Sequence, residues 1–335
     1  MAEAYIVAAA RTAGGRRGGR LKDVHPADLG GQVINALLDR TGVDPDQIED
    51  VIFGCVSQAG EQSSNVARNV VLSSMLPESV PATSVDRQCG SSQQALHFAA
   101  QAVMSGAMDV VIAGGVESMS RVPMGLPSTL PFQNGFGTSK GQAMADRYPG
   151  VQFSQFAGAE AIARKHGFTR EQLDAFGYES HRRAAAATQA GFFDDEILPI
   201  RVTSADGEAL DHTADEGIRF DASLDSMAQV KLLLEGGCLT AATSSQICDG
   251  ASAVMVVNER GLTRLGLEPL ARIHHMAVLG GDPVIMLEAP LAATERALAR
   301  SGLSINDIDL YEVNEAFASI PLAWLKATGA DPERL

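Results

Sequence analysis

The sequence predicts an α/β protein built around a mainly parallel sheet. Between Tyr5 and Gly115, short apolar runs alternate with segments of helical periodicity, which is the pattern of strand–helix–strand units. A stretch near residue 40 recurs near residue 300, which indicates a duplicated unit. The length of 335 residues suits two or three packed units rather than one small domain.

The first part of the chain supplies most of the predicted strands. An apolar strand is expected over 5–10, and a helix over about 28–42 carries Leu29, Val33 and Leu37 on one face. Further strands are expected at 50–56, 82–86 and 109–113, and further helices at 65–75 and 92–104. Gly42 and Gly106 follow two of the helices, where a glycine commonly ends a helix.

The middle of the chain differs in composition. Gly, Pro, Gln and Phe scatter through 123–156, and turn residues and charges fill 194–225. Helices are expected at 157–166 and 170–190, and a strand returns at 249–257. We interpret this region as a large, loop-like insertion that covers a site.

The last part of the chain repeats the first. Arg300-Ser301-Gly302-Leu303 aligns with Arg40-Thr41-Gly42-Val43 at an offset of 260 residues, without a gap. The alignment predicts a helix, a glycine, an acidic turn and then a strand at 309–312. The same offset places Leu335 opposite position 75 of the first copy, so we expect the second copy to be incomplete.

Composition excludes several classes of partner. The chain has 26 basic and 41 acidic residues, a net charge of −15, so nucleic acid and anionic membrane surfaces are not expected partners. The apolar runs are too short to span a bilayer, and the first ten residues lack a basic signal-peptide region. Four widely spaced cysteines show no metal-binding pattern and indicate reduced thiols in a cytoplasmic protein.

A candidate nucleophile lies in the segment Asp86-Arg87-Gln88-Cys89-Gly90-Ser91-Ser92. Cys89 falls between the end of a predicted strand and the start of a predicted helix, where backbone N–H groups and the helix dipole favour a thiolate. Gly90 would let a substrate approach the backbone closely. Cys89 is therefore either a nucleophile beside an oxyanion site or a small buried residue in a tight turn.

Two further polar segments are candidates for a ligand site. Asn314 follows the predicted strand at 309–312, where its amide would either position a water or polarise a thioester oxygen, or else cap the next helix. The run Thr240-Ala241-Ala242-Thr243-Ser244-Ser245-Gln246 carries small hydroxyl residues that suit a polar ligand wall or an ordinary turn.

Five segments together resemble the thiolases, a family of acyl-CoA acyltransferases. They are Ala10-Arg11-Thr12, Gln88-Cys89-Gly90-Ser91, the run from Ala113 to Ser120, Asp249-Gly250-Ala251-Ser252-Ala253 and Asn314-Glu315-Ala316-Phe317, in the order found in the family. The resemblance implies the thiolase fold, two duplicated α/β halves with a central inserted loop domain. It places the N-terminal half at 1–119 plus about 246–268, the loop domain at 120–245 and an incomplete C-terminal half at 269–335.

The resemblance also implies chemistry. Cys89 resembles the cysteine that the substrate acylates, and its N–H would serve one oxyanion site. Asn314 resembles the residue whose amide holds a water in the other. Ser245 resembles the serine at the pantetheine arm, and Arg219 and Ser226 resemble loop-domain residues near the nucleotide of coenzyme A. The implied reaction cleaves 3-ketoacyl-CoA with CoA, or condenses acetyl-CoA, in lipid degradation. CoA is a substrate, no resident cofactor is expected, and the enzyme would be a homodimer or homotetramer.

The sequence departs from the family in two places. Ala241-Ala242-Thr243 stands where many members have Ala-Gly-Asn, a variant that resembles thiolases of lipid and steroid side-chain breakdown. The family's Gly-His-Pro and Cys-x-Gly segments do not follow Phe317, and they supply the base and the second catalytic cysteine. The alternative expectation is therefore a truncated, catalytically impaired acyl-CoA binding protein.

No other histidine or condensing-enzyme pattern fills that role. His97 lies about 12 Å along its helix from Cys89, beyond hydrogen-bond reach. The remaining histidines are expected at surface, loop or half-buried strand positions: His25, His166, His181, His212, His274 and His275. A related ketoacyl synthase would carry two histidines, or a histidine and an asparagine, after the nucleophile, whereas Asn314-Glu315-Ala316-Phe317 favours a thiolase.

Overall fold

A computed structural model describes residues 2–204 and 206–335, and their packing forms two compact units. The first unit comprises Met1–Ser139, Gly191–Gly217 and Ile247–Ile273, and the second comprises Lys140–Ala190, Ile218–Gln246 and His274–Leu335. The expected division into two duplicated halves and a loop domain stays a prediction, because packing units report contacts and not duplication. Within the described residues, every helix is either too short or too polar to cross a lipid bilayer.

The first unit is built on one mixed sheet in the order β10-β1-β9-β5-β3-β4. Its strands are β1 (Tyr5–Thr12), β2 (Gly15–Arg16), β3 (Asp50–Gly54), β4 (Ala82–Val85), β5 (Val110–Ser118), β6 (Ile197–Leu198), β9 (Cys248–Val257) and β10 (Ala271–Arg272). β3 runs parallel to β4 and β5, as expected for α/β units, whereas β9 runs antiparallel to β1 and β5. The α/β prediction is confirmed, with β9 as an antiparallel strand inside it.

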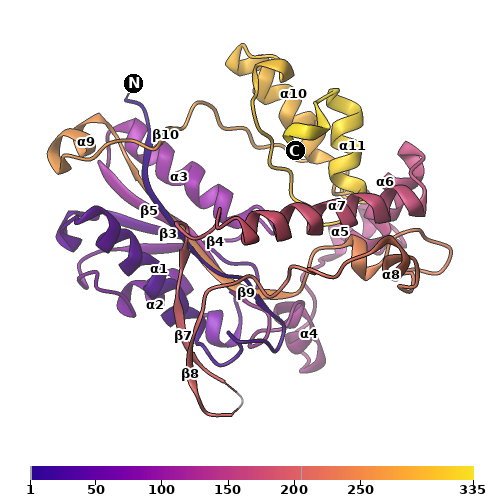
Figure 1. Ribbon diagram of the computed structural model, residues 1–335, viewed down its shortest axis with the longest axis horizontal. Helices are drawn as coiled ribbons and strands as arrows, with labels where there is room; N and C mark the ends of the chain where they lie inside the picture. The colour runs from indigo at the N-terminus through magenta and orange to yellow at the C-terminus, as the bar shows by residue number, and fades with distance from the viewer. Residues whose placement is uncertain (1, 205) are drawn as a thin grey trace. The chain divides into compact units, whose positions relative to one another are not determined.

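Helices cover both faces of this sheet (Figure 1). α1 (Pro26–Thr41) and α2 (Val66–Leu72) pack on one face, and α3 (Ser91–Ser105) packs on the other. The remaining helical segments of the unit are α4 (Leu126–Gln133), α9 (Glu259–Leu265), η1 (Pro45–Gln47) and η2 (Gly60–Gln62). The predicted positions of α1, α2 and α3 are confirmed to within a few residues at their ends.

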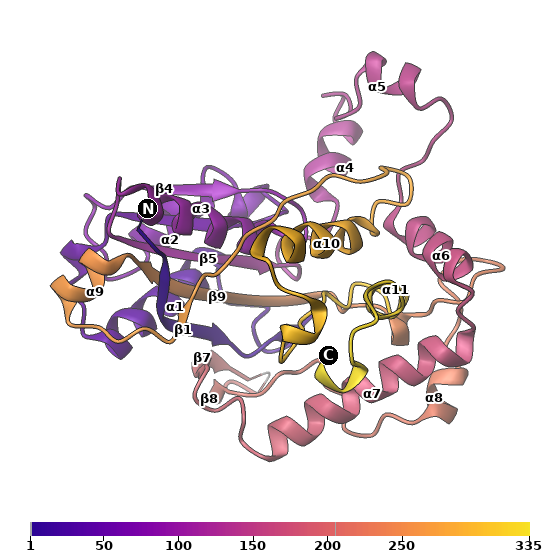
Figure 2. The ribbon, with the colours of Figure 1, turned by 90° about the horizontal axis from the view of Figure 1, so that it is seen from above.

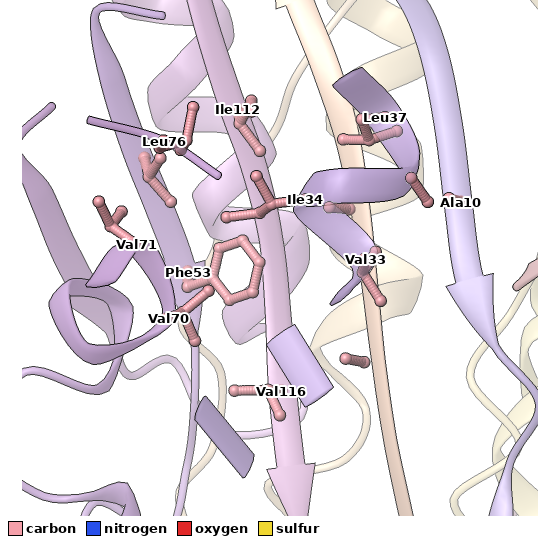
Figure 3. Packing of buried hydrophobic residues seen from close by; sticks show 14 of the residues in the cluster. Ala10, Val33, Ile34, Leu37, Phe53, Val70, Val71, Leu76, Ile112 and Val116 are labelled. Carbon is pink, nitrogen blue, oxygen red and sulfur yellow. The ribbon is translucent and has the colours of Figure 1, made fainter. Parts of the chain in front are cut away.

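Several of the largest buried side chains lie between α1, α2 and the sheet. Phe53 of β3 is fully buried against Ile34 of α1, Val70 of α2 and Ile112 of β5 (Figure 3). Alternate residues of a strand face opposite sides of the sheet, so Ile112 points to this core while Val111 points to the other face. Replacing a buried phenylalanine by alanine typically lowers the free energy of unfolding by about 3–5 kcal/mol.

Glycines let α3 lie directly on the sheet. A Cβ at Gly54 would lie 2.4 Å from the backbone carbon of Ser91, and one at Gly115 would lie 2.0 Å from Oγ of Ser92. No side chain fits at either place, because real Cβ atoms do not approach other heavy atoms so closely. The start of α3, which follows Cys89, is therefore held by backbone-to-backbone packing.

Replacing Gly54 by alanine is expected to destabilise the fold by about 1–3 kcal/mol, because the new methyl group must displace the first turn of α3. Gly90→Ala is the matched control, since a Cβ there meets its nearest atom, the carbonyl oxygen of Arg87, at 3.6 Å. Urea unfolding of both variants measures the difference. Equal stability of Gly54→Ala and the parent protein would contradict the close approach.

The second unit is mainly helical around a smaller apolar core. Its helices are α5 (Gln142–Arg147), α6 (Gln155–His166), α7 (Arg170–Gln189), α8 (Leu224–Ala228), α10 (Ala289–Ser301) and α11 (Ser319–Thr328), with 3-10 turns η3 (Ala241–Thr243), η4 (Ile305–Asp307) and η5 (Pro332–Arg334). Residues of α6, α11 and the segment before α11 are buried together, among them Ile162, Phe317 and Ile320. The helices predicted at 157–166 and 170–190 are confirmed as α6 and α7.

Part of the predicted duplication is visible as local geometry. α1 ends at Thr41, Gly42 closes it in the left-handed region and η1 follows at Pro45–Gln47. The end of α10 at Ser301, left-handed Gly302 and η4 occupy the same positions 260 residues later. The matching glycines each donate their N–H to a carbonyl four residues earlier.

The strand predicted at 309–312 is wrong. The first copy continues into β3, which is hydrogen-bonded between β4 and β5. The corresponding segment is coil, and its bonds go instead to the turn η5: the Tyr311 N–H donates to the Arg334 carbonyl, and the Arg334 guanidinium donates to the Ile308 carbonyl. A sequence pattern can favour a strand, but a strand forms only where a neighbouring strand pairs with it.

The loop-like interpretation of 194–225 is also incomplete. This region holds β6, the start of α8 and a hairpin of β7 (Ile200–Thr203) and β8 (Ala209–His212), which pair antiparallel. His212, expected at a surface or loop position, is fully buried and its Nε2 lies 3.1 Å from the Ala13 carbonyl oxygen. Burial lowers the pKa of His212 below its ordinary value of 6.5.

Stability is expected to fall in acid because of His212. The unfolded chain protonates this ring near pH 6.5, whereas the folded chain protonates it only at lower pH, so unfolding takes up a proton in that window. The free energy of unfolding should drop below pH 6.5 by up to about 1.4 kcal/mol per pH unit. Urea unfolding at pH 7.5 and 5.5 should show a smaller drop in His212→Gln but not in the exposed control His275→Gln. An unchanged drop in His212→Gln would contradict this assignment.

Candidate functional site

Cys89 lies where the sequence predicts it, between a strand and a helix. β4 ends at Val85, α3 begins at Ser91, and the Cys89 side chain is exposed. The interpretation of Cys89 as a small buried residue is therefore wrong. An exposed thiol at the start of a helix is placed as a reactive cysteine usually is.

The turn before Cys89 is held by its own side chains. Gln88 has a φ of +49°, in the left-handed region that glutamine seldom occupies. The Asp86 carboxylate accepts the Gln88 backbone N–H at 2.8 Å and its side-chain amide at 3.1 Å. The Ser91 hydroxyl donates to the Gln88 carbonyl at 2.6 Å. Because such a conformation persists only where neighbours enforce it, these contacts fix the direction in which Cys89 leaves the turn.

The other three cysteines lie in environments that disfavour the thiolate. Burial and the carboxylate of Glu117, 3.7 Å away, raise the pKa of the Cys55 thiol. Burial and Glu160 raise the pKa of Cys238 to about 11. The surrounding protein partly desolvates the Cys248 sulfur, and this desolvation, assisted by the Asp249 carboxylate, raises the pKa of the thiol although part of the residue is exposed. A neutral thiol is a weak nucleophile, so Cys89 remains the candidate nucleophile.

The second unit contains a pocket of about 620 Å³. Its walls come from α7, from α8 and the loop before it, from the run Ala241–Gln246, and from the segment preceding α11. Four of the five predicted site residues line it: Arg219, Ser226, Ser245 and Asn314. These residues are spread over almost a hundred positions of sequence, and folding gathers them around one cavity. Cys89 belongs to the first unit.

Backbone pairing joins the two segments that carry Ser245 and Asn314. The Ser245 N–H donates to the Ala316 carbonyl at 2.9 Å, and the Ala318 N–H donates to the Thr243 carbonyl at 2.9 Å. The residue that caps α11 is Ala318, so the alternative in which Asn314 caps that helix is wrong. The Asn314 amide is exposed and lines the pocket.

The run 240–246 forms a turn and also lines the pocket, and its role as a ligand wall stays a prediction. Thr240 caps the short turn η3, with its hydroxyl accepting the Ala242 N–H, while Ala241 to Gln246 line the pocket. Buried Glu160 of α6 fixes the approach to this turn, since its carboxylate accepts the N–H groups of Cys238 and Leu239 at 2.9–3.0 Å. The polar wall is therefore anchored on a rigid helix.

His181, expected at a surface or loop position, lines the pocket. It lies on α7 beside Phe176, Gly177 and Ser180, all of which line the pocket. The Arg219 N–H donates to Nδ1 of His181 at 3.3 Å. Burial and the Arg219 charge lower the pKa of His181, which keeps the ring neutral. The helical spacing of 176, 177, 180 and 181 was a signal, because those positions share one face.

Comparisons with known proteins agree over nearly the whole chain. The family described as thiolase, N-terminal domain, matches residues 4–260, and the family described as thiolase, C-terminal domain, matches residues 267–335. The steroid 3-ketoacyl-CoA thiolase FadA6 of Mycobacterium tuberculosis is 48% identical over 337 residues, covering 100% of this chain and 81% of that protein. A 3-ketoacyl-CoA thiolase of Psychrobacter sp. is 42% identical over 97% of this chain and 82% of its own length.

A solved structure extends the agreement to the fold. The crystal structure of the Bacillus anthracis acetyl-CoA acetyltransferase matches with a TM-score of 0.89 and 33% identity, covering 100% of this chain and 85% of that one. The thiolase fold expected from the sequence is thereby confirmed. On both family matches and on relatives of this similarity, the chain belongs to the thiolase family.

Proposed function

We propose that the chain transfers acyl groups between CoA thiols through a thioester on Sγ of Cys89, while the pocket of the second unit holds the CoA carrier. Membership of the thiolase family makes it an acyl-CoA C-acyltransferase. The observation that carries the rest of the proposal is the gathering of Arg219, Ser226, Ser245 and Asn314 around one cavity of about 620 Å³.

The pocket offers chemistry that suits CoA. Phe176, Met227 and Val230 supply apolar surface for the adenine ring and the pantetheine chain. Arg219 supplies a guanidinium for phosphate, and the hydroxyls of Ser226 and Ser245 supply hydrogen bonds. CoA acts here as a substrate, and we propose no resident cofactor.

The reaction proceeds in two transfers. In the degradative direction the Cys89 thiolate attacks the keto carbon of a 3-ketoacyl-CoA, and the bond between the second and third acyl carbons breaks. The acetyl-CoA carbanion that leaves takes up a proton. A second CoA thiol then attacks the thioester, loses its proton and releases Cys89 as thiolate. Hydrogen bonds to each developing oxyanion, with the Asn314 amide serving one through a water, lower both barriers.

The substrate class, the cellular location and the oligomeric state are further parts of this proposal. We propose lipid-derived 3-ketoacyl-CoA substrates for two reasons. The first relative above is called a steroid 3-ketoacyl-CoA thiolase. The variant Ala241-Ala242-Thr243 also resembles the segment found in thiolases of lipid and steroid side-chain breakdown. We also propose a cytoplasmic location and a homodimer or homotetramer. Light scattering on the purified protein tests the oligomer, and a monomer at micromolar concentration would contradict it.

A thiolysis assay tests the proposal. Purified chain is mixed with acetoacetyl-CoA and CoA, acetyl-CoA formation is followed, and CoA binding is measured by calorimetry. We expect both thiolysis and CoA binding. Arg219→Ala should weaken CoA binding. The control Arg201→Ala, which removes an exposed arginine of the β7–β8 hairpin, should not. CoA binding without thiolysis would contradict acyl transfer and support the acyl-CoA binding alternative. Failure to bind CoA would contradict the pocket assignment.

A further inference from the structure

One wall of the pocket is a helix too short to be stable alone. α8 spans five residues, Leu224–Ala228, and Ser226 and Met227 face the pocket. An isolated helix of this length does not persist in water, because the first turn costs more conformational entropy than its hydrogen bonds return. The shape of this wall therefore depends on contacts with the rest of the unit.

Arg170, the first residue of α7, supplies the main polar contact. Its Nη2 donates to the Met227 carbonyl at 2.7 Å and to the Val230 carbonyl at 3.2 Å, where α8 ends. The last carbonyls of a helix lack intrahelical partners and carry the negative end of its dipole, so a guanidinium stabilises them. α7 and α8 lie side by side in this unit (Figure 2).

Asp174 orients the guanidinium of Arg170. Its Oδ2 accepts Nε of Arg170 at 2.6 Å, and its side chain is only 6% exposed. Its Oδ1 is buried and accepts no hydrogen bond from any residue that the structure describes. Burying a carboxylate with one unsatisfied oxygen costs folding free energy. We therefore interpret Asp174 as a residue that is retained for the position in which it holds Arg170.

The packing of α7 against α8 and η3 near Gly177 leaves little room for α8 to move. A Cβ added at Gly177, two turns along α7 from Arg170, would lie 2.9 Å from the Met227 Cε and 2.9 Å from the Ala242 carbonyl oxygen. α7, α8 and η3 thus meet without space for one additional methyl group. A shift of α8 would move Ser226 and Met227 with respect to the α7 wall.

We propose that Arg170 and Asp174 are positioning residues for the CoA carrier. They hold α8 in the place where its side chains complete the pocket, and neither residue lines the pocket itself. This inference rests on the proposed function, in which the pocket binds CoA. The pair acts on carrier binding and not on the chemistry at Cys89, so it affects KM and leaves kcat nearly unchanged.

The test compares Arg170→Ala, Arg170→Lys and Asp174→Asn with the control Arg182→Ala. Arg182 lies on the same helix, is exposed, and forms an ion pair with Glu179 at 2.6 Å. Arg170→Ala is expected to raise the Kd for CoA and the KM for acetoacetyl-CoA about tenfold, since it removes two hydrogen bonds from a charged donor. Arg170→Lys should recover part of this loss, because an ammonium can reach a carbonyl but cannot bridge two carbonyls and a carboxylate. Arg182→Ala should change neither constant by more than about twofold.

Calorimetric binding of CoA separates the possible failures. A parent protein that does not bind CoA contradicts the proposed function. A parent that binds CoA, with Arg170→Ala binding equally well, overturns this inference alone, as does a loss of kcat larger than the rise in KM. Circular dichroism checks folding. If Arg170→Ala does not fold, the nearly isosteric Asp174→Asn decides: a rise in Kd of at least about threefold supports the inference, and an unchanged Kd overturns it.

Discussion

Cys89→Ala is expected to reduce acyl transfer by a factor on the order of 10⁴–10⁶, because the variant has no atom that can form the thioester. The fold should survive, since the exposed thiol makes no core contact and α3 is positioned by Gly54 and Gly115. The measurement is the rate of acetyl-CoA formation from acetoacetyl-CoA and CoA. The affinity for CoA should stay within about twofold of the parent value, because the pocket residues are unchanged.

Cys248→Ala is the matched control for that result. Cys248 is also exposed in part and belongs to the same unit, but partial desolvation and the Asp249 carboxylate raise the pKa of its thiol. The account therefore expects Cys248→Ala to retain its activity. If activity survives in Cys89→Ala and disappears in Cys248→Ala, then Cys248 is the nucleophile and the assignment to Cys89 is wrong.

Asn314→Ala is expected to lower kcat by about 10²–10³-fold, the usual cost of removing one oxyanion donor. The amide is exposed in the pocket and does not cap α11, so its loss should hardly affect stability. Asn314→Asp keeps the size of the side chain but replaces the donor with a carboxylate, and it should be at least as impaired. Steady-state kinetics on both variants, with CoA binding measured in parallel, checks the expectation.

A large rise in the Kd for CoA with an unchanged kcat would contradict this role. Asn314 would then be a contact for the carrier, like Ser245, and not a group that acts on the developing charge.

Local periodicity predicted much of the fold. The apolar runs at β1, β3 and β5 and the helical spacing of α1 and α3 are properties of neighbouring residues, which a sequence displays directly. The direction of β9 is not such a property, because it depends on where the 129 residues between β5 and β9 return the chain to the sheet. α4 was not predicted, since Pro131 lies inside it and obscures its period.

The candidate site divides in the same way. The position of Cys89 between a strand and a helix could be predicted from adjacent residues, and Arg219, Ser226, Ser245 and Asn314 from their resemblance to a known pattern. The left-handed conformation of Gln88 depends on its contact with Asp86, which no spacing rule reveals. Helical spacing places His181 on one face with other residues of the pocket wall, but its contact with the Arg219 N–H is visible only in the structure. The unsatisfied carboxylate of Asp174 is likewise visible only in three dimensions.

Mass spectrometry of the acylated protein tests whether Cys89 carries the acyl group. The purified chain is incubated with acetoacetyl-CoA in the absence of free CoA, quenched in acid, digested and mapped for acyl groups. We expect one acetyl thioester, on the peptide that contains Cys89, and its removal when fresh CoA is added before the quench. An acyl group on Cys55, Cys238 or Cys248 instead, or steady turnover with no acyl-cysteine at any time, would contradict it.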